Sequence, residues 1–160
     1  MQLSIGDKVP DFVGKSHTGD PVRLHELVGK APIALFFYPG DFTPVCTTEA
    51  CGFRDLATEL ANTGVMILGI STDAIETHKR FADAYDLPFP LVSDPDQIIA
   101  KQYGATSALL CLLGRAKRLT FVVDLEGRIV EIIQADLSAR KHIDGVREAL
   151  KRIRFEPRSV

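Results

Sequence analysis

Residues 33–46 decide the fold, because they join an apolar run to the start of a helix; they read IALFFYPGDFTPVC. A continuous apolar run over positions 33–38 is typical of a central strand that is covered on both faces. Pro39 ends the run. Thr43 suits the N-cap of a helix and Pro44 its first residue. The segment therefore predicts a buried strand that leads directly into a helix.

Predicted strands and helices alternate on both sides of this segment, which favours an α/β layered fold. A small β-hairpin is expected around residues 12–24, and the stretch 105–117 has no clear pattern. Asp73 with Glu76 resembles a capping box. The other expected elements are the first helix ending at 62–64, a strand over 65–70, a helix from 75 that ends at 87–88, a strand over 89–92, a short helix over 94–104, strands over 119–124 and 128–134, and a helix from Ser138.

The composition limits the class of protein. The chain has 160 residues, 46% hydrophobic and 25% charged, which predicts one domain over residues 1–160. A net charge of −2 argues against nucleic-acid binding. No apolar run approaches the roughly 18 residues of a membrane span, and the first ten residues do not resemble a secretory signal. Three cysteines fit a reducing compartment, so a cytoplasmic location is expected.

Cys46 is the candidate reactive residue. It falls at the third position of the predicted helix, where backbone N–H groups lack helical acceptors and the helix dipole is positive. Both effects favour the thiolate, which is the nucleophilic form. The side chain of Thr43, one turn earlier, can reach the N–H or the sulfur of Cys46. The alternative is that Cys46 packs as a small hydrophobic residue.

Cys51 follows five residues later. On an ideal helix the two Cα atoms lie roughly 8.7 Å apart, beyond the limit of about 7 Å for a disulfide. The cysteines therefore either never pair, or pair only when the first turns unwind, which Gly52 makes easier by up to ~1 kcal/mol. Cys51 could also be a helix residue without a redox role. The cysteines and histidines show no metal-ligand spacing, so neither a metal nor another cofactor is expected.

Residues 37–51 resemble the active site of peroxiredoxins, above all the Q type, also called the bacterioferritin-comigratory-protein group. Pro39, Thr43 and Cys46 match the Pro-x3-Thr-x2-Cys pattern of the family, and Cys51 matches the second cysteine of the Q type. The similarity extends over most of the chain. It implies a thioredoxin-like fold with an N-terminal β-hairpin and a central mixed sheet flanked by helices.

The resemblance also implies a mechanism. Cys46 would attack hydrogen peroxide or an organic hydroperoxide and become a sulfenic acid. Cys51 would convert it to an intramolecular disulfide, which thioredoxin or a glutaredoxin would reduce. Thr43 and a catalytic arginine, which falls on Arg118, would hold the peroxide, and Pro39 would shield the pocket from water. The implied activity is a thioredoxin-dependent peroxidase. The similarity implies a monomer, while the apolar stretch 108–113 leaves a weak homodimer open.

Several alternatives remain open from the sequence. The chain could be a peroxide sensor or interaction protein with slow turnover, whereas the Cys-x4-Cys spacing disfavours a general disulfide reductase. Arg115 is a rival for the role of Arg118. Glu49 could order the active-site helix or only complement its dipole. The apolar stretch 108–113 departs from the family, and is either a surface patch for dimers or bulky hydroperoxides, or a buried element in which Cys111 packs; Cys111 could also be the resolving cysteine.

Overall fold

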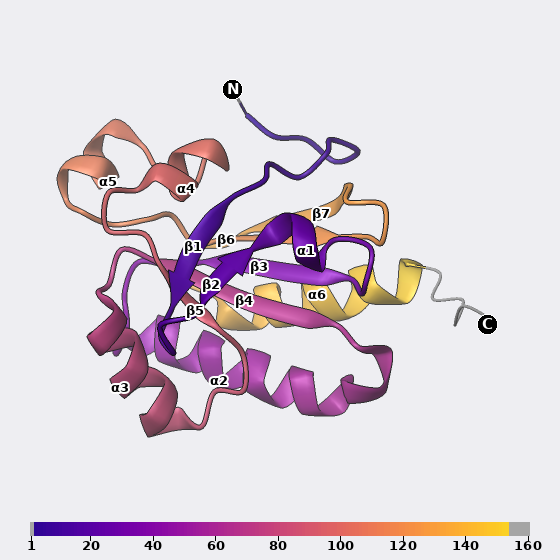
Figure 1. Cartoon of the computed structure of the whole chain (residues 1–160), viewed down its shortest axis with the longest axis horizontal. Helices are drawn as coiled ribbons and strands as arrows, with labels where there is room; N and C mark the ends of the chain where they lie inside the picture. The colour runs from indigo at the N-terminus through magenta and orange to yellow at the C-terminus, as the bar shows by residue number, and fades with distance from the viewer. Residues whose placement is uncertain (1, 154–160) are drawn as a thin grey trace.

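The computed structural model describes residues 2–153, which form one seven-stranded sheet with helices on both faces (Figure 1). The strands are β1 (Val13–Ser16), β2 (Pro21–Arg23), β3 (Ile33–Phe37), β4 (Met66–Ser71), β5 (Leu91–Ser93), β6 (Leu119–Val123) and β7 (Ile129–Gln134). The helices are α1 (Leu24–Leu27), α2 (Pro44–Glu59), a 3₁₀ turn (Ala61–Thr63), α3 (Ile75–Tyr85), α4 (Ile98–Gln102), α5 (Ala108–Leu112) and α6 (Ala139–Arg152).

The sheet is mixed, with strand order β2-β1-β5-β4-β3-β6-β7. The three strands β3, β4 and β5 run parallel to one another, while β6 pairs antiparallel with β3 and β1 pairs antiparallel with β5. Strands β1 and β2 form the N-terminal hairpin. The predicted α/β class, hairpin and mixed sheet are therefore confirmed.

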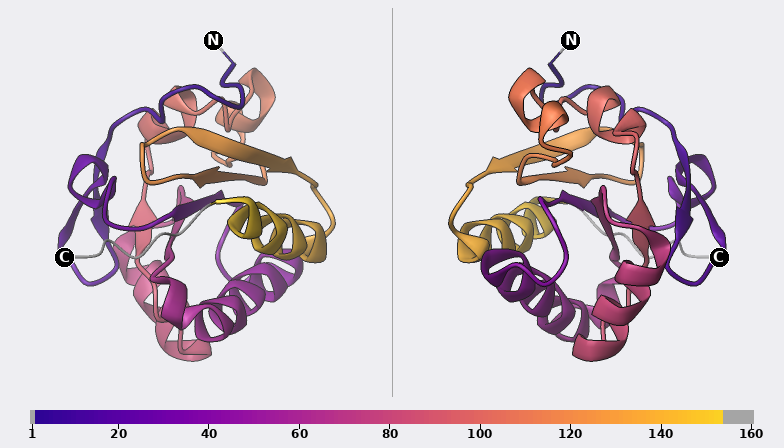
Figure 2. Two further views of the ribbon diagram at one scale, coloured as in Figure 1. Left: turned by 90° about the vertical axis from the view of Figure 1, so that its right-hand side faces the viewer. Right: turned by 90° about the vertical axis from the view of Figure 1, so that its left-hand side faces the viewer.

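Two hydrophobic cores lie on opposite faces of the sheet. The helices on the two faces are seen in Figure 2. Strand β3 supplies both, because its side chains alternate between the faces and all five are fully buried. Helices α2, α3 and α6 cover one face, and their core includes Cys46. Helices α1 and α4 cover the other. Within the part of the chain that the structure describes, no helix has both the length and the apolar character of a membrane span.

Helices α3 and α4 begin differently from expectation. The N-cap of α3 is Ala74 and makes no side-chain capping bond, so the predicted capping box is wrong. Asp73 instead accepts a hydrogen bond from the hydroxyl of Ser71. Helix α4 begins at Ile98 rather than at 94, because the carboxylate of Asp94 reaches forward and accepts the N–H groups of residues 99 and 100 at 3.1 and 2.9 Å.

Gly52 is a packing residue between α2 and α6. A Cβ at this position would lie 2.8 Å from Cγ1 and 3.0 Å from Cδ1 of Ile143. We expect Gly52→Ala to destabilise the fold by about 1–3 kcal/mol through overpacking, although alanine is the better helix former by up to ~1 kcal/mol. Denaturant unfolding measures the change. In an Ile143→Ala background the same substitution should cost less; an equal cost in both backgrounds would contradict the packing explanation.

Candidate functional site

Cys46 lies in the first turn of α2, as predicted. Thr43 is the N-cap, with the extended backbone that a cap requires, and Pro44 is the first helical residue. The sulfur is buried, because Cys46 exposes only 1% of its surface. Thr43 does not cap the helix with its side chain; its hydroxyl donates to the carbonyl oxygen of Gly40 at 2.8 Å. Only the lone pairs of that hydroxyl therefore remain for a ligand.

Arg118 reaches the sulfur from the position directly before β6. Phe37, the last residue of β3, pairs with Leu119, the first residue of β6. Residue 118 is therefore held at the end of β3 from which α2 begins. The guanidinium is 5% exposed, and its Nη2 donates to Sγ of Cys46 at 3.1 Å. Arg115 is exposed to solvent. Of the two arginines, the structure brings Arg118 to Cys46.

Glu49 binds a second nitrogen of the same guanidinium. It lies one turn after Cys46 on α2, so the two side chains share a face. Its Oε1 accepts from Nη1 of Arg118 at 2.9 Å, and Nε of Arg118 donates to the carbonyl oxygen of Asp136 at 2.9 Å. Glu49 is fully buried. It is therefore not a surface acid that only complements the helix dipole.

His142 is a neighbour of the site that the sequence analysis did not select. Its Nδ1 lies 3.6 Å from Oε2 of Glu49, and both side chains are fully buried. The available signal was its place on the buried face of α6, together with Ala139, Val146 and Ala149. That spacing shows that a histidine faces the core, but it does not show which residue it meets.

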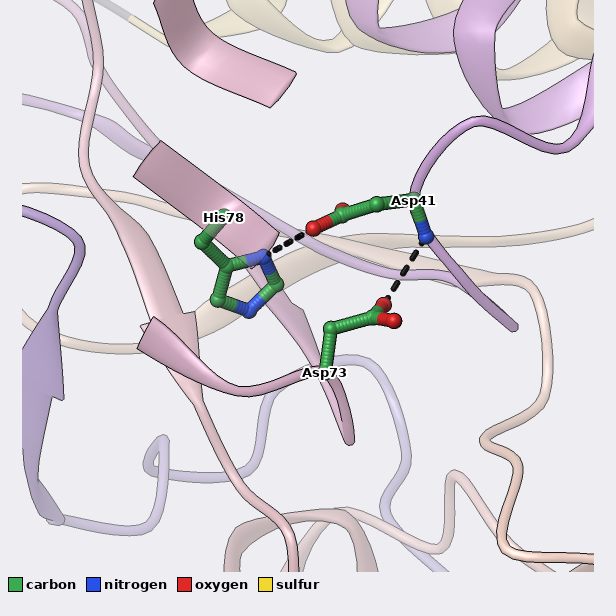
Figure 3. Close-up of side chains that lie close together, drawn as sticks. All are labelled: Asp41, Asp73 and His78. Carbon is green, nitrogen blue, oxygen red and sulfur yellow. Dashed lines mark hydrogen bonds and ion pairs between the residues drawn. The ribbon is translucent and has the colours of Figure 1, made fainter. Parts of the chain in front are cut away.

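A second polar network fixes the loop that precedes α2 (Figure 3). One carboxylate oxygen of Asp41 lies 2.6 Å from Nδ1 of His78, and the other accepts the hydroxyl of Tyr38 at 2.6 Å. The backbone N–H of Asp41 donates to Asp73 at 2.8 Å. Nε2 of His78 faces the carbonyl oxygen of Val92 at 3.2 Å. The loop is thus tied to β3, β4, α3 and β5.

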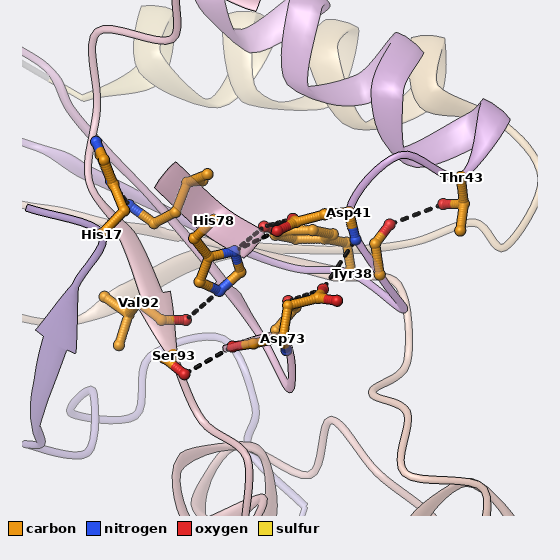
Figure 4. A network of polar contacts seen from close by, with 11 residues as sticks. His17, Tyr38, Asp41, Thr43, Asp73, His78, Val92 and Ser93 are labelled. Carbon is orange, nitrogen blue, oxygen red and sulfur yellow. Dashed lines mark hydrogen bonds and ion pairs between the residues drawn. The ribbon is translucent and has the colours of Figure 1, made fainter. Parts of the chain in front are cut away.

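The network extends to Thr43 through the backbone, because Gly40, which accepts the Thr43 hydroxyl, directly precedes Asp41 (Figure 4). Burial, with the nearby carboxylate of Asp41, raises the pKa of Tyr38 well above its usual value. The phenol therefore stays neutral and remains a hydrogen-bond donor. Phe42 lies in the left-handed region at φ 63° and packs edge-on against Phe81 with centroids 5.0 Å apart.

Asp41, Asp73 and His78 also meet the geometric requirement for a cation site, since their ligand atoms lie within 4.8 Å of one another. Hydrogen bonds account for that proximity. Asp41 accepts Tyr38, and Asp73 accepts both the hydroxyl of Ser71 and the N–H of Asp41. The cluster is satisfied by the protein itself and serves as a loop anchor.

Cys51 and Cys111 are both free and partly exposed. Helix α2 is continuous through Cys46 and Cys51, so a disulfide between them requires the helix to open. Cys111 lies on α5, which has no buried residue. The interpretation of 108–113 as a buried element is therefore wrong: Leu109, Leu112 and Leu113 are 65%, 84% and 60% exposed.

Comparison with known proteins identifies the family. The model of the AhpC/TSA family matches residues 5–132. Peroxiredoxin Bcp of Bacillus subtilis (strain 168) is 38% identical over 135 residues, covering 82% of this chain and 85% of that protein. Peroxiredoxin Q, chloroplastic, of Sedum lineare is 38% identical over 153 residues, covering 96% and 81%.

Solved structures agree. The crystal structure of peroxidoxin BcpB from Mycobacterium tuberculosis matches with a TM-score of 0.88 at 39% identity, covering 96% of this chain and 100% of that one. A cysteine-to-serine mutant of PrxQ from Xylella fastidiosa matches with a TM-score of 0.82 at 26% identity, covering 94% and 97%. The chain therefore belongs to the AhpC/TSA family and is a thiol-dependent peroxidase of the peroxiredoxin Bcp/Q type.

Proposed function

We propose that Cys46 is the peroxidatic residue and that Arg118 activates both the sulfur and the peroxide. The observation that carries the proposal is the 3.1 Å contact between Nη2 of Arg118 and the buried sulfur at a helix N-terminus. The permanent charge of arginine stabilises a thiolate there. Because Nη2 of a guanidinium carries two N–H groups, the same nitrogen can also meet charge that develops on the peroxide.

In the first reaction step, water supplies the proton that the leaving oxygen takes up. The thiolate attacks the terminal oxygen of the hydroperoxide, the S–O bond forms and the O–O bond breaks. Sulfur is oxidised to a sulfenic acid, and the leaving oxygen takes a proton from water to give water or an alcohol. Thr43 has its hydroxyl proton committed to Gly40, so it accepts the O–H of the peroxide and orients it. Pro39, half-buried before the loop, shields the sulfur from bulk water.

Cys51 then resolves the sulfenic acid. The Cys51 thiol loses its proton and attacks Sγ of Cys46. The S–S bond forms, the S–O bond breaks, and the leaving hydroxide takes up that proton and departs as water. A dithiol reductant of the thioredoxin or glutaredoxin type restores both thiols. Hydrogen peroxide and alkyl hydroperoxides are the substrates, the protein acts in the cytoplasm, and it works as a monomer or weak homodimer. The three exposed leucines on and beside α5 favour the dimer, because association would cover them.

Substitution of the cysteines tests this mechanism. Cys46→Ser should abolish peroxide consumption. Cys51→Ser should consume about one equivalent to reach the sulfenic acid, with one more for each further oxide, and then stop, whereas the wild type turns over with thioredoxin. Mass analysis should find oxidised wild type lighter by two hydrogens, with Cys46 linked to Cys51.

Cys111→Ser is the matched control and should keep full turnover and the same link. A link between Cys46 and Cys111 would remove Cys51 from the mechanism. A single turnover by the wild type that ends in a stable disulfide would favour the sensor over the enzyme cycle.

A further inference from the structure

Arg118 donates hydrogen bonds to Cys46 and Glu49 at once, and the inference from this geometry rests on the proposed roles of Arg118 and Cys46. The guanidinium donates to Sγ of Cys46 with Nη2 and to Oε1 of Glu49 with Nη1. The sulfur and the carboxylate therefore share one positive charge. Whatever neutralises Glu49 leaves more of that charge to Cys46.

Oε2 of Glu49 is unsatisfied. Among the described residues it has no hydrogen-bond partner, although it is buried. Nδ1 of His142 lies 3.6 Å from this oxygen. A buried carboxylate oxygen without a donor is costly, so this one has a strong tendency to acquire a proton.

The contacts of His142 determine which of its nitrogens carries the hydrogen. Nε2 lies 2.9 Å from the carbonyl oxygen of Ala135, which can only accept, so Nε2 carries a hydrogen. In the neutral ring Nδ1 then has a lone pair, which accepts the hydroxyl of Thr120 at 2.7 Å. No hydrogen lies between Nδ1 and Oε2 until a proton is added. Oε2 of Glu49 and Nδ1 of His142 are therefore two proton acceptors 3.6 Å apart, and a proton on either one removes the net negative charge of the pair.

We propose that Glu49 and His142 form a buried pair that binds a single proton. When the pair holds this proton, the positive charge of Arg118 is available to stabilise the thiolate of Cys46. His142 is then a positioning residue that acts on the sulfur through Glu49 and Arg118. The coupling is reciprocal: ionisation of Cys46 raises the affinity of the pair for its proton, and loss of the proton disfavours the thiolate.

The titratable groups around the pair place its proton near neutral pH. Burial raises the pKa of Glu49 to about 7, with Arg118 opposing the rise. Burial also lowers the pKa of His142; the Ala135 carbonyl opposes this, Arg118 adds to it, and Asp136 opposes it. Below neutral pH the pair holds its proton and is neutral overall, so the positive charge of Arg118 acts mainly on Cys46. Above it the carboxylate of Glu49 competes for the guanidinium.

The pH profile of Cys46 alkylation tests the effect on the sulfur, in a Cys51→Ser/Cys111→Ser background so that one thiol reports. Glu49→Gln keeps an acceptor for Arg118 and removes the charge, so it should move the midpoint of alkylation to lower pH by about one unit. Glu59→Gln is the matched control: this exposed acid on the same helix pairs with Arg147, and its loss should leave the midpoint in place. An unchanged or raised midpoint in Glu49→Gln overturns the coupling.

The ¹⁵N signals of the His142 ring test the pair without peroxidase chemistry and without a substitution at Glu49. We expect a hydrogen on Nε2, a lone pair on Nδ1 at high pH, and one step near neutral pH. In Cys46→Ser the step should move to lower pH, because the thiolate no longer draws the proton inward. A hydrogen on Nδ1 in the neutral ring, or a step at the same pH in wild type and Cys46→Ser, overturns the proposal. Failure of Cys46 to turn over peroxide would leave these signals unchanged.

Discussion

Arg118→Ala is expected to lower the second-order rate constant for peroxide reduction by about 10²–10³-fold. Loss of thiolate alone cannot account for that. A free cysteine is roughly 7% thiolate at pH 7.4 and a fully activated one roughly 96%, a difference of about 13-fold. The remainder comes from the donors that Arg118 aims at charge developing along the O–O bond. Stopped-flow measurement of hydrogen peroxide consumption gives the rate constant.

Three variants sharpen this test. Arg118→Lys keeps a charge but loses the planar fork that meets Cys46 and Glu49 together, so it should recover only part of the rate. Arg118→Ala/Glu49→Gln removes the buried carboxylate that the single variant leaves without a cation. Arg115→Ala, at an exposed arginine three residues earlier, is the control and should react as the wild type. If the rate constant of Arg118→Ala fell by less than about 13-fold, Arg118 would act only by stabilising the thiolate.

The sequence predicted those parts of the fold that local chemistry determines. The buried strand up to residue 38, the helix that begins at Pro44 and the third helical position of Cys46 each follow from neighbouring residues. Arg118 came from the family resemblance. Arg118 lies near Cys46 because Phe37 pairs with Leu119, and this strand register could not be predicted from the sequence.

The two charged contacts that fix Asp41 and Arg118, which the sequence did not predict, join distant positions. Asp41 meets His78 across 37 residues, and Glu49 meets Arg118 across 69. In the structure His78 and His142 each lie on the buried face of a helix, and an inward-facing histidine can meet many partners. Partner choice depends on how α3 and α6 pack on the sheet, and this is a property of the whole fold.

The apolar composition of segment 108–113 left two interpretations open, a surface patch and a buried element. The structure shows a helix of only five residues, α5, that lies at the surface. Its polar contacts are made by the backbone: the carbonyl oxygen of Cys111 accepts from Gln97, and that of Gly114 accepts from Thr72. Such contacts hold the segment in place without burying its leucines. Composition alone therefore could not predict its exposure.

Asp41→Ala is expected to be the most destabilising single change near the site, at about 3–5 kcal/mol, because it removes one partner of a buried pair. Both carboxylate oxygens are used, and their loss leaves His78 and the hydroxyl of Tyr38 without their acceptor in a region where both are fully buried. A protein of this size has a total stability of about 5–15 kcal/mol, so the change would consume a large share of it. The midpoint and slope of denaturant unfolding measure the loss.

Two further substitutions distinguish the stability lost with the buried network from the general cost of losing an aspartate. Asp55→Ala removes an exposed acid that pairs with Arg54, and should change stability by less than about 1 kcal/mol. Asp41→Asn keeps the size and an acceptor, so its cost should lie between those of the other two variants. The same loop carries the Gly40 carbonyl that orients Thr43, so the folded fraction of Asp41→Ala should also react more slowly with peroxide. If Asp41→Ala were as stable as the wild type, the loop would be held by packing, and the hydrogen bonds of Asp41 would contribute little to its stability.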